Sequence, residues 1–490
     1  MTHFCPAYPQ PRKHKASRFL MFFSARRSWL DGLYERSYRM QMGEVHLPGV
    51  DLYMVNAPAL VRRVLVDEPA EFPKSGLMGD ALRPLLGDSV FTTSGAKWAR
   101  QRAMMEPAFA HARLQVALPV MREAVQAMLA RLGALPDGSA HDLEIEMTHV
   151  TADIIFRTIF SQPLAGEAAH RIFAAFARFQ SLAPRLLLPS VYGLRWLVSP
   201  WDVWQSRKAA REIRGLLEAL VKPRFDMCHP AAGTVPQPPG QAPQNDVLDA
   251  FLRARDPLTG APFAFDELVD QVAMLFLAGH ETSASALSWA LYLVAQAPVV
   301  QQRMHREVEA LGLGADMGLS SSADLKSLTL TRNVFRETLR LFPPVGFLAR
   351  QSAQNCPMRD KTVEQGASVV ISPWLIHRHR DLWREPDAFN PDRYDDDASR
   401  DSLRDAYLPF GMGPRVCIGA AFAQQEAVLI LAGIVREYRL QAVPGHVPQP
   451  VGRLTIRSAN GVRLTLHRRA VDKSGENDVP NSETVAGAAA

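Results

Sequence analysis

Cysteine is scarce in this chain of 490 residues, and its spacing does not suit a structural role. The four cysteines, Cys5, Cys228, Cys356 and Cys417, include no Cys-x-x-Cys pair. A disulfide scaffold or a structural zinc site would need closely spaced cysteines, so the sequence argues against both. A reducing compartment, and therefore a cytoplasmic location, is the expectation.

An excess of charge of one sign is also missing. The chain has 55 Lys and Arg against 50 Asp and Glu, which gives a net charge of +5. Nucleic-acid binding needs positive charge gathered on one face, and this mild excess does not predict it. Hydrophobic residues make up 47% of the chain, enough for most of it to fold around a core.

Neither a secretory leader nor a membrane-spanning helix is predicted. The basic N-terminus is followed by an apolar run, 19–23, that is shorter than the roughly 7–15 residues of a signal sequence. The stretch 282–302 has no charged side chain, but Glu281 precedes it and serines and glutamines interrupt it. A carboxylate inside lipid is costly. We therefore expect a long helix buried in a soluble domain, and an N-terminal arm, 1–39, without a membrane span.

A glycine loop for dinucleotides or phosphates is absent as well. The segment that starts at Gly312 fails the Gly-x-Gly-x-x-Gly pattern at Met317, and the one at Gly411 fails at Val416.

Apolar residues at spacings of three and four dominate the sequence that is present. They predict helices over 114–132, 148–160, 171–185, 201–225, 266–297, 327–341 and 420–438. Strands are expected over 44–54 and 362–371, and as a hairpin of 453–457 with 462–466 around Asn460-Gly461. The fold class is mainly α with small β-sheets: one large domain, 40–468, with a long central helix, followed by a disordered tail, 469–490.

The segment 409–419, Pro-Phe-Gly-Met-Gly-Pro-Arg-Val-Cys-Ile-Gly, places Cys417 in a tight turn before a helix. The helix dipole there favours a thiolate. A thiolate in a rigid loop suits an axial ligand of haem iron. Arg415 could then pair with a haem propionate, Gly419 admit the flat ring, and Phe410 shield the sulfur. Inert packing of a lone cysteine is the alternative, and the whole loop favours ligation.

Glu337 and Arg340 are three residues apart, so they share one helix face. A surface ion pair of small energetic value is the usual meaning of that spacing. Arg393, which follows Phe389 and Pro391, would enclose the pair in a loop. The three residues are then a structural triad that holds the cysteine loop and carries no chemistry.

The segment Ala278-Gly279-His280-Glu281-Thr282 brings an acid and a hydroxyl into the middle of the apolar helix. Gly279 would let the backbone lie against a flat ring. The Thr282 hydroxyl could instead bond the carbonyl of Ala278 in its own helix, and both interpretations can hold together.

Trp98 and Arg102 are four residues apart, share a helix face and can both donate to a propionate. Lys97 and Arg100 lie on a different face of that helix and are expected to point outward. His377 and His379 are adjacent to basic residues, and a structural or propionate-side role is favoured over metal binding.

These segments, in this order, resemble the cytochrome P450 family of haem-thiolate monooxygenases over about residues 40 to 468. The resemblance implies haem b (iron protoporphyrin IX) with Cys417 as the axial ligand of the metal. It also implies that Glu281 and Thr282 relay protons and that Arg350 binds a propionate. Ala278, Val345, Phe347 and Leu348 would line the substrate pocket.

The implied reaction transfers one oxygen atom of O2 to a lipophilic small molecule, by hydroxylation or epoxidation, in a monomeric enzyme. About seventy residues follow the cysteine loop, too few for a flavin or iron–sulfur domain, so a separate ferredoxin or flavodoxin is the expected electron donor. The helix with Lys97 and Arg100 would face that donor. A peroxygenase or isomerase without a redox partner is the alternative, and the presence of Glu281 and Thr282 argues against it. A non-catalytic haem sensor is a third hypothesis, which turnover of any substrate with a surrogate reductase would discriminate from the other two.

Overall fold

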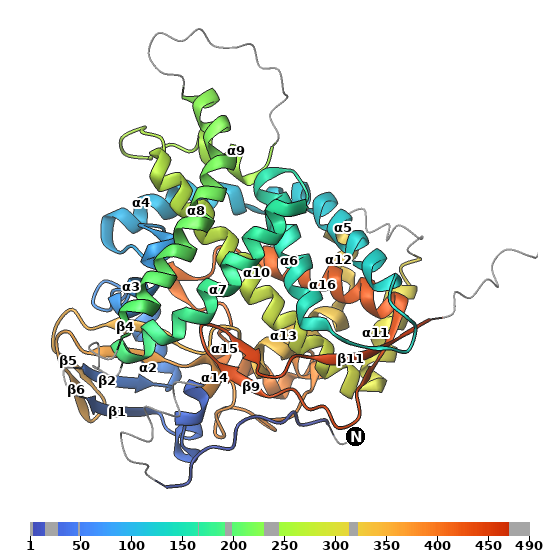
Figure 1. Cartoon of the computed structure of the whole chain (residues 1–490). Coiled ribbons are helices and arrows are strands. Elements are labelled where there is room, and N and C mark those ends of the chain that lie inside the picture. Colours follow the sequence, from blue (N-terminus) through green and yellow to red (C-terminus); the bar gives the residue numbers. More distant parts are fainter. Residues whose placement is uncertain are drawn as a thin grey trace, which may run out of the picture.

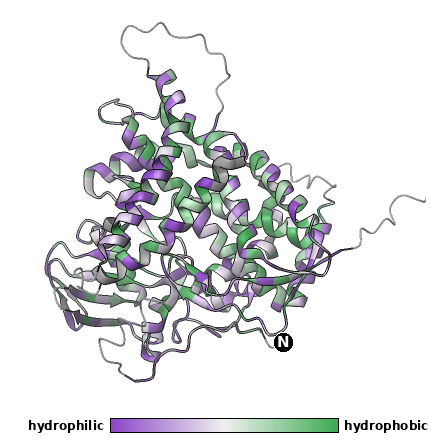
Figure 2. Ribbon diagram, viewed as in Figure 1, coloured by the Kyte–Doolittle hydropathy of each residue, from purple (hydrophilic) through white to green (hydrophobic). Residues whose placement is uncertain are grey.

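The computed structural model describes residues 3–14, 28–47, 50–164, 166–191, 198–229, 245–312 and 322–469. Helices make up most of the molecule, and a small sheet lies at one corner (Figure 1). Apolar residues are concentrated on the interior helices, whereas polar residues dominate the outer segments (Figure 2). The expected class, mainly α with small sheets, is confirmed.

The longest helices include those predicted from the spacing of apolar residues. They are α5 (His111–Gly133), α6 (Leu143–Phe160), α7 (Gly166–Val191), α8 (Pro200–Cys228), α10 (Phe265–Gln296), α13 (Thr329–Leu341) and α16 (Ala420–Glu437). Shorter helices connect them: α2 (Pro58–Arg62), α3 (Gly76–Leu86), α4 (Gly95–Met105), α9 (Val247–Arg253), α11 (Pro298–Glu309), α12 (Ser322–Ser327), α14 (Pro373–Ile376) and α15 (Arg400–Ala406).

The main sheet has the strand order β1 (Met42–Leu47), β2 (Val50–Val55), β7 (Ser368–Ile371), β4 (Leu348–Gln351). A second sheet joins β3 (Ala140–Asp142), β11 (Arg463–Arg468) and β8 (Tyr438–Ala442). Two strand pairs complete the set: β5 (Cys356–Met358) with β6 (Lys361–Val363), and β9 (Pro450–Gly452) with β10 (Ile456–Ser458).

Three strand predictions were wrong in detail. The segment 44–54 is a hairpin of β1 and β2, and 362–371 is divided between β6 and β7. The predicted hairpin around Asn460-Gly461 does not form, because β10 pairs with β9 and β11 pairs with β3 and β8. Gly461 still turns the chain at a φ of 74°, but it sends the two strands to different sheets.

Helix α10 runs through the middle of the molecule (Figure 1) and belongs to two hydrophobic cores. Its residues 268–277 contribute to a core with α3, α6, α7, α8 and α9, here the α7 core, which contains Phe156, Phe176 and Phe276. Its residues 284–295 contribute to a core with α5, α13 and α16, here the α16 core, which contains Trp289 and Leu431. Between them lies the segment that the sequence singled out for chemistry.

The beginning of the chain, predicted as an N-terminal arm, packs against the body of the fold. Phe4 meets the ring of Tyr292 edge-on at 6.0 Å, and Tyr8 lies 6.2 Å from Trp374. The expected disorder of the tail falls on residues 470–490, which are outside the described residues, as are 15–27.

In the part of the chain that the structure describes, no single helix meets the length and hydropathy needed to cross a bilayer. Helices α10 and α11 pass such a test only as a pair, and they are bent by 109° relative to each other.

Glu337, Arg340 and Arg393 form one buried cluster. Arg340 donates to both carboxylate oxygens of Glu337 at 2.9 Å, and Arg393 donates to one of them at 2.9 Å. The remaining Arg340 donors reach the carbonyls of His377, Pro386 and Ala388 at 2.7–2.9 Å. The side chains of Glu337 and Arg340 have no exposed surface. The one acid is bonded to both arginines, and backbone carbonyls accept the remaining Arg340 donors, which lowers the cost of burying these charges.

Glu337→Ala should therefore strongly destabilise the fold, because Arg340 and Arg393 would keep their charges inside the protein without an acid. We expect a loss of roughly 3–5 kcal/mol in the free energy of unfolding, measured by urea denaturation. The matched control is Arg303→Ala, which breaks the exposed 2.7 Å ion pair with Asp392 and should cost about 0–1 kcal/mol. Equal, small losses in both variants would contradict a structural role for the triad.

Candidate active site

The loop before α16 holds Cys417 in a fixed turn. The Cys417 N–H donates to the carbonyl of Phe410 at 3.0 Å. Gly413 has a φ of 71°, and a Cβ there would lie 2.0 Å from the carbonyl oxygen of Leu65. Only glycine fits that position. Gly413 therefore allows the backbone at Leu65 to pack directly against the turn.

The surroundings of Cys417 leave its sulfur accessible. Burial raises the pKa of the Cys417 thiol, while the backbone N–H of Gly419 and the charge of Arg102 act in the opposite direction. The side chain nevertheless keeps exposed surface, and a Cβ added at Gly419 would meet no atom within 4 Å. An external group can therefore approach the sulfur from this side.

A chain of hydrogen bonds connects the triad to this loop through His377. Arg340 donates to the His377 carbonyl at 2.8 Å, and the His377 ring accepts from the N–H of Leu408 at Nε2, at 3.0 Å. Burial and two nearby arginines lower the pKa of His377 to about 3, so the ring is neutral and can accept that bond. The Leu408 carbonyl then accepts from Gly411, inside the loop.

The middle of α10 is partly exposed to solvent, whereas the helix on either side of it is buried. From Leu268 to Ala295 every residue is buried except Ala278, Gly279 and Thr282. The neighbouring Ser283 bonds Glu426 of α16, and Ile418 of the cysteine loop packs on the α7 core. These contacts bring the open segment and the Cys417 loop into one region.

Two details of this segment refine the sequence interpretation. The Thr282 hydroxyl donates to the carbonyl of Ala278 at 2.8 Å, the intrahelical bond left open above. A Cβ at Gly279 would lie 2.9 Å from Cγ1 of Ile155 in α6. The glycine is thus required by the close packing of α6 on α10.

Three cations gather beside the loop. The backbones of Lys74 and Arg350 form an antiparallel bridge, and Lys74 Nζ lies 3.3 Å from the ring centre of Phe91. Arg415 donates to the carbonyl of Thr93 at 3.0 Å. Burial, with the charges of Arg415 and Arg350, holds the pKa of Lys74 well below its usual value. Burial and Arg350 lower the pKa of Arg415 to about 10.

None of the ion pairs among the described residues includes Lys74, Arg350 or Arg415. Three mutually repelling, largely buried cations are costly unless an anion joins them. A haem, with its two propionates and flat apolar ring, fits this set of donors together with the accessible sulfur of Cys417.

Trp98 and Arg102 lie in α4, beside the same loop. The guanidinium of Arg415 lies 4.3 Å from the ring centre of Trp98. Arg102 donates to the Val416 carbonyl at 2.9 Å and pairs with Glu106 at 2.9 Å. Its charge is therefore partly compensated within the protein, unlike that of Arg415.

The expectation for the outer face of α4 was half wrong. Lys97 is exposed and bonds Asp88 at 2.7 Å. Arg100 instead points inward and pairs with Asp256 at 3.2 Å and Glu267 at 2.7 Å. Acidic residues far away in the sequence attract Arg100, and helical periodicity alone does not reveal them.

The apolar residues expected in the substrate pocket lie near the loop. Val345, Phe347 and Leu348 are partly exposed, and a Cβ at Gly411 would lie 3.7 Å from Cδ1 of Leu348. The structure therefore brings this stretch close to the cysteine loop.

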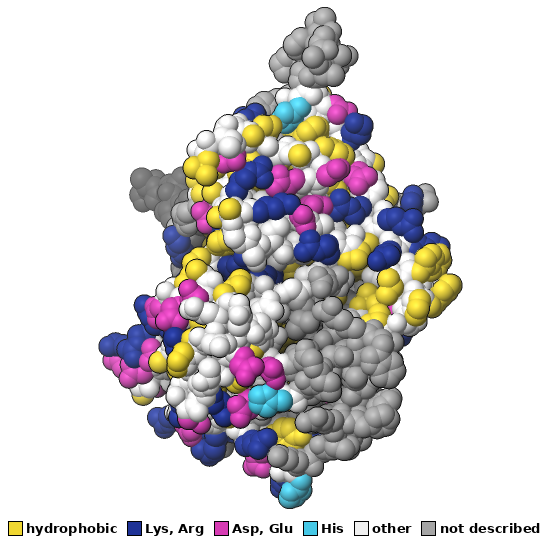
Figure 3. Space-filling model, turned by 90° about the vertical axis from the view of Figure 1, so that its left-hand side faces the viewer, with side chains coloured by type: hydrophobic (Ala, Val, Ile, Leu, Met, Phe, Trp, Pro, Cys, Tyr) yellow, Lys and Arg dark blue, Asp and Glu magenta, His cyan; other side chains and the backbone are white. Residues whose placement is uncertain are grey.

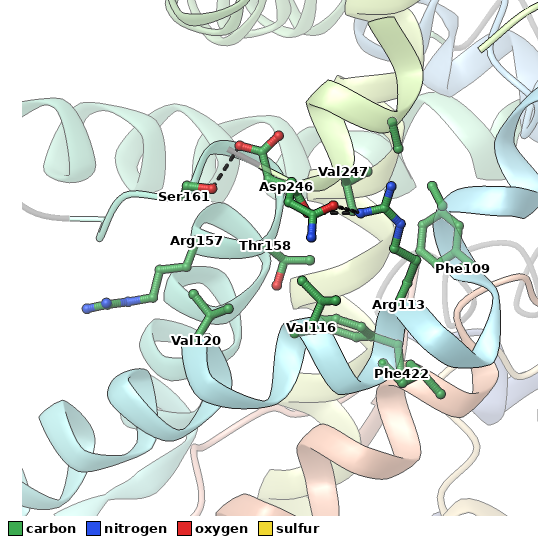
Figure 4. Close-up of a pocket in the computed structure, with 15 residues that line it drawn as sticks. Phe109, Arg113, Val116, Val120, Arg157, Thr158, Ser161, Asp246, Val247 and Phe422 are labelled. Carbon is green, nitrogen blue, oxygen red and sulfur yellow. Dashed lines mark hydrogen bonds between the residues drawn. The ribbon is translucent and has the colours of Figure 1, made fainter. Parts of the chain in front are cut away.

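A separate pocket opens between α5, α6, α9 and the first turn of α16 (Figure 4). Phe109, Val116, Val120 and Phe422 supply apolar lining. Arg113 at its rim is bonded to the carbonyl of Asn245 at 3.0 Å. None of the candidate site residues lines it. Among the described residues, no group of three or more His, Cys, Asp or Glu could hold a metal ion.

Several site residues carry no recognisable signal in the sequence. Lys74 lies between Pro73 and Ser75, outside any motif, and comes to the site through its bridge to Arg350. Arg457 and Thr455, which bind Glu281, lie in a segment of ordinary strand composition. Only long-range pairing places them at the site.

Lys74→Met should have opposite effects on the empty and the haem-loaded protein. Removing one of three repelling cations should leave the apoprotein as stable or more stable. Losing a charged bond worth about 1.5–3 kcal/mol should weaken haem binding roughly 10- to 100-fold. Haem transfer to apomyoglobin and thermal unfolding of the apoprotein measure the two effects. Lys97→Met is the control; unchanged haem affinity in Lys74→Met would exclude it from the propionate site.

Comparison with known proteins places the chain in a family. The model described as Cytochrome P450 matches residues 29–461. Cyclooctatin synthase of Streptomyces melanosporofaciens is 32% identical over 414 residues, 83% of this chain and 84% of the relative. Pentalenene oxygenase of Streptomyces avermitilis is 28% identical over 87% and 90% of the two chains. The crystal structure of the cytochrome P450DA heme domain superposes with a TM-score of 0.75 at 23% identity, over 88% of this chain and 90% of its own, which supports the fold.

The matched region contains the cysteine loop, the buried triad and the open segment of α10. Members of this family bind haem and use O2, lipophilic substrates and redox partners. The chain belongs to the cytochrome P450 family and is a haem-dependent monooxygenase.

Proposed function

We propose that Cys417 is the axial ligand of the haem and that Thr282, with Glu281, delivers protons during oxygen activation. Bound haem would activate O2, and electron donation by the thiolate would favour O–O cleavage. The observation that carries the proposal is the opening of α10 at Ala278, Gly279 and Thr282, in a helix that is otherwise buried from Leu268 to Ala295. It exposes a hydroxyl to the same region as the Cys417 sulfur.

Five cationic or indole side chains complete the proposed haem site. Arg350, Arg415 and Lys74 would neutralise the propionates, because no carboxylate of the described residues pairs with them. Trp98 would hold Arg415 by the cation–π contact at 4.3 Å. Arg102, bonded to Val416, would fix the loop beside the sulfur. Phe410, Gly279 and Gly419 would contact the ring.

The substrate proposed is an apolar cyclic alkene or its alcohol. Ala278, Val345, Phe347 and Leu348 supply hydrocarbon surface near the loop. The bacterial relatives are named for pentalenene and for cyclooctat-9-en-7-ol. A relative from mouse is named leukotriene-B4 omega-hydroxylase, at 29% identity, so long-chain acids are the second candidate class.

The haem domain would span residues 40–468 of a cytoplasmic monomer that receives electrons from a separate ferredoxin or flavodoxin. Exposed Lys97 supports an acidic donor, because α4 contacts the cysteine loop through Arg102. The ion pair of Lys97 with Asp88 and the inward position of Arg100 make this attraction weaker than the sequence predicted. On the face drawn in Figure 3, acidic and basic side chains of the described residues alternate, without one extended patch of either sign.

Thr282→Ala tests the proton role against the peroxygenase alternative. With O2 and a reductant, we expect electrons to be diverted to hydrogen peroxide, while turnover supported by added peroxide is retained. Product formed per electron is the measurement. Ser288→Ala is the control, since it removes a similar hydroxyl bonded within α10, to Ala284 at 2.7 Å, but inside the α16 core. Parental coupling in Thr282→Ala would refute the relay.

The substrate class can be tested by the haem spin-state shift on binding. Cyclic terpenoid alkenes and their alcohols should displace the water ligand and shift the spectrum at lower concentration than linear fatty acids with the same number of carbon atoms. Tighter binding of the linear acids would contradict the proposed class and favour the second one.

A further inference from the structure

The Glu281 carboxylate is fully engaged by groups from other elements. Thr455 donates to Oε1 at 2.6 Å, and Arg457 donates through Nε to Oε1 at 2.9 Å and through Nη2 to Oε2 at 2.7 Å. Gln180 donates to Oε2 as well. Glu281 is 4% exposed. The acid next to the proposed proton-donating hydroxyl is thus held away from solvent, and this hold was not foreseen from the sequence.

These donors come from two separate parts of the fold. Arg457 lies in β10 and Thr455 immediately before it, whereas Gln180 lies in α7. Arg457 also reaches Glu144 of α6 at 2.9 Å, so one guanidinium bridges two acids. Because Arg457 cannot be deprotonated in proteins, the group that can change state in this cluster is an acid.

The β10 segment adjoins the proposed substrate pocket, and α7 contacts the part of α10 that carries Glu281. The N–H of Ile456 in β10 donates to the carbonyl of Pro344 at 3.1 Å, next to the stretch that lines the pocket. On α7, Phe176 meets the ring of His280 at 5.4 Å, one residue before Glu281. A substrate that displaces either element changes the donors around the acid.

The charges around Glu281 fix its state in the resting protein. Burial raises the pKa of Glu281, but Arg457, His280 and the Thr455 hydroxyl outweigh it, and the pKa lies below its usual value. Glu144 faces Arg457 from α6, and α7 contributes the neutral amide of Gln180. The acid is therefore a carboxylate with no oxygen available to a water molecule.

We propose that Arg457, Thr455 and Gln180 are positioning residues for Glu281, and that Gln180 makes proton supply depend on the position of α7. Charge-assisted bonds from Arg457 are the stronger ones, so the Gln180 amide is the first to be exchanged for a water. A proton from bulk solvent then reaches the carboxylate through that water, which stays a water molecule. Glu281 passes the proton to the Thr282 oxygen while the Thr282 hydroxyl gives its own proton to the oxygen that is being reduced, so one proton enters and one leaves. Glu281 returns to its charged form beside Arg457.

This inference rests on the proposed proton role of Thr282 and Glu281. Substrates that displace α7 would be oxygenated with little loss of electrons, and substrates too small to displace it would be poorly coupled. The measured quantity is the product formed per electron with a large and with a small substrate. Gln180→Leu keeps the size of the side chain and removes the donor, so the difference between the two substrates should be smaller in this variant than in the parent. An unchanged difference would overturn the gating role.

Arg457→Met tests the hold itself. With the guanidinium gone, the main opposition to burial is lost, and the pKa of Glu281 should rise. The pH profile of product per electron should then acquire a titration that the parent lacks, and Arg457→Lys should lie between the two. A profile identical to the parent's in both variants would overturn the positioning role of Arg457.

The thermal unfolding temperature tests the same contacts without turnover and shows whether the variants are folded. Arg457→Met should lower the Tm, and Glu281→Gln in that background should recover part of the loss, because one of the two acids left without Arg457 is then neutral. Arg404→Met, which breaks an exposed pair with Asp405 at 2.7 Å, should change the Tm little. If Thr282→Ala loses coupling while the Arg457 and Gln180 variants keep the parental product per electron, this inference is refuted and the proposed function stands. Full coupling in Thr282→Ala would refute the proposed function.

Discussion

The architecture depends on one helix that two hydrophobic cores share. Residues 268–277 of α10 are buried in the α7 core and residues 284–295 in the α16 core. The six residues between them belong to neither core. Polar side chains can therefore occur in the middle of a buried helix without interrupting the packing on either side, and a cofactor and a substrate can reach the backbone there.

Two clusters of buried charges differ in whether the protein itself supplies the opposite charge. In the first, Glu337 is matched by Arg340 and Arg393, and backbone carbonyls accept most of the remaining donors. In the second, Lys74, Arg350 and Arg415 are together without an acid among the described residues. The first cluster is linked to the cysteine loop through His377, whereas the role proposed for the second is to bind the haem propionates.

The sequence predicted what depends on local order and missed what depends on long-range pairing. The cysteine turn, the Glu337–Arg340 spacing and the long helices follow from neighbours in the chain, and the structure has them. The Asn460-Gly461 turn is also local, but which strands it joins is decided by β9 and β3, far away in the sequence. Arg100 turned inward for the same reason, because Asp256 and Glu267 attract it.

The acid of the central helix shows why a motif alone does not define a mechanism. The order Glu281-Thr282 indicates an acid and an alcohol side by side, yet the two side chains have different surroundings. Thr282 keeps exposed surface, and Glu281 is enclosed by donors from α7 and the β10 segment. A lone carboxylate at that depth would be neutral, because burial favours the uncharged form. Arg457 keeps it charged, and the same bond prevents it from exchanging protons freely. In the proposed mechanism, the strength of these bonds, which come from residues outside the motif, determines when the acid can act.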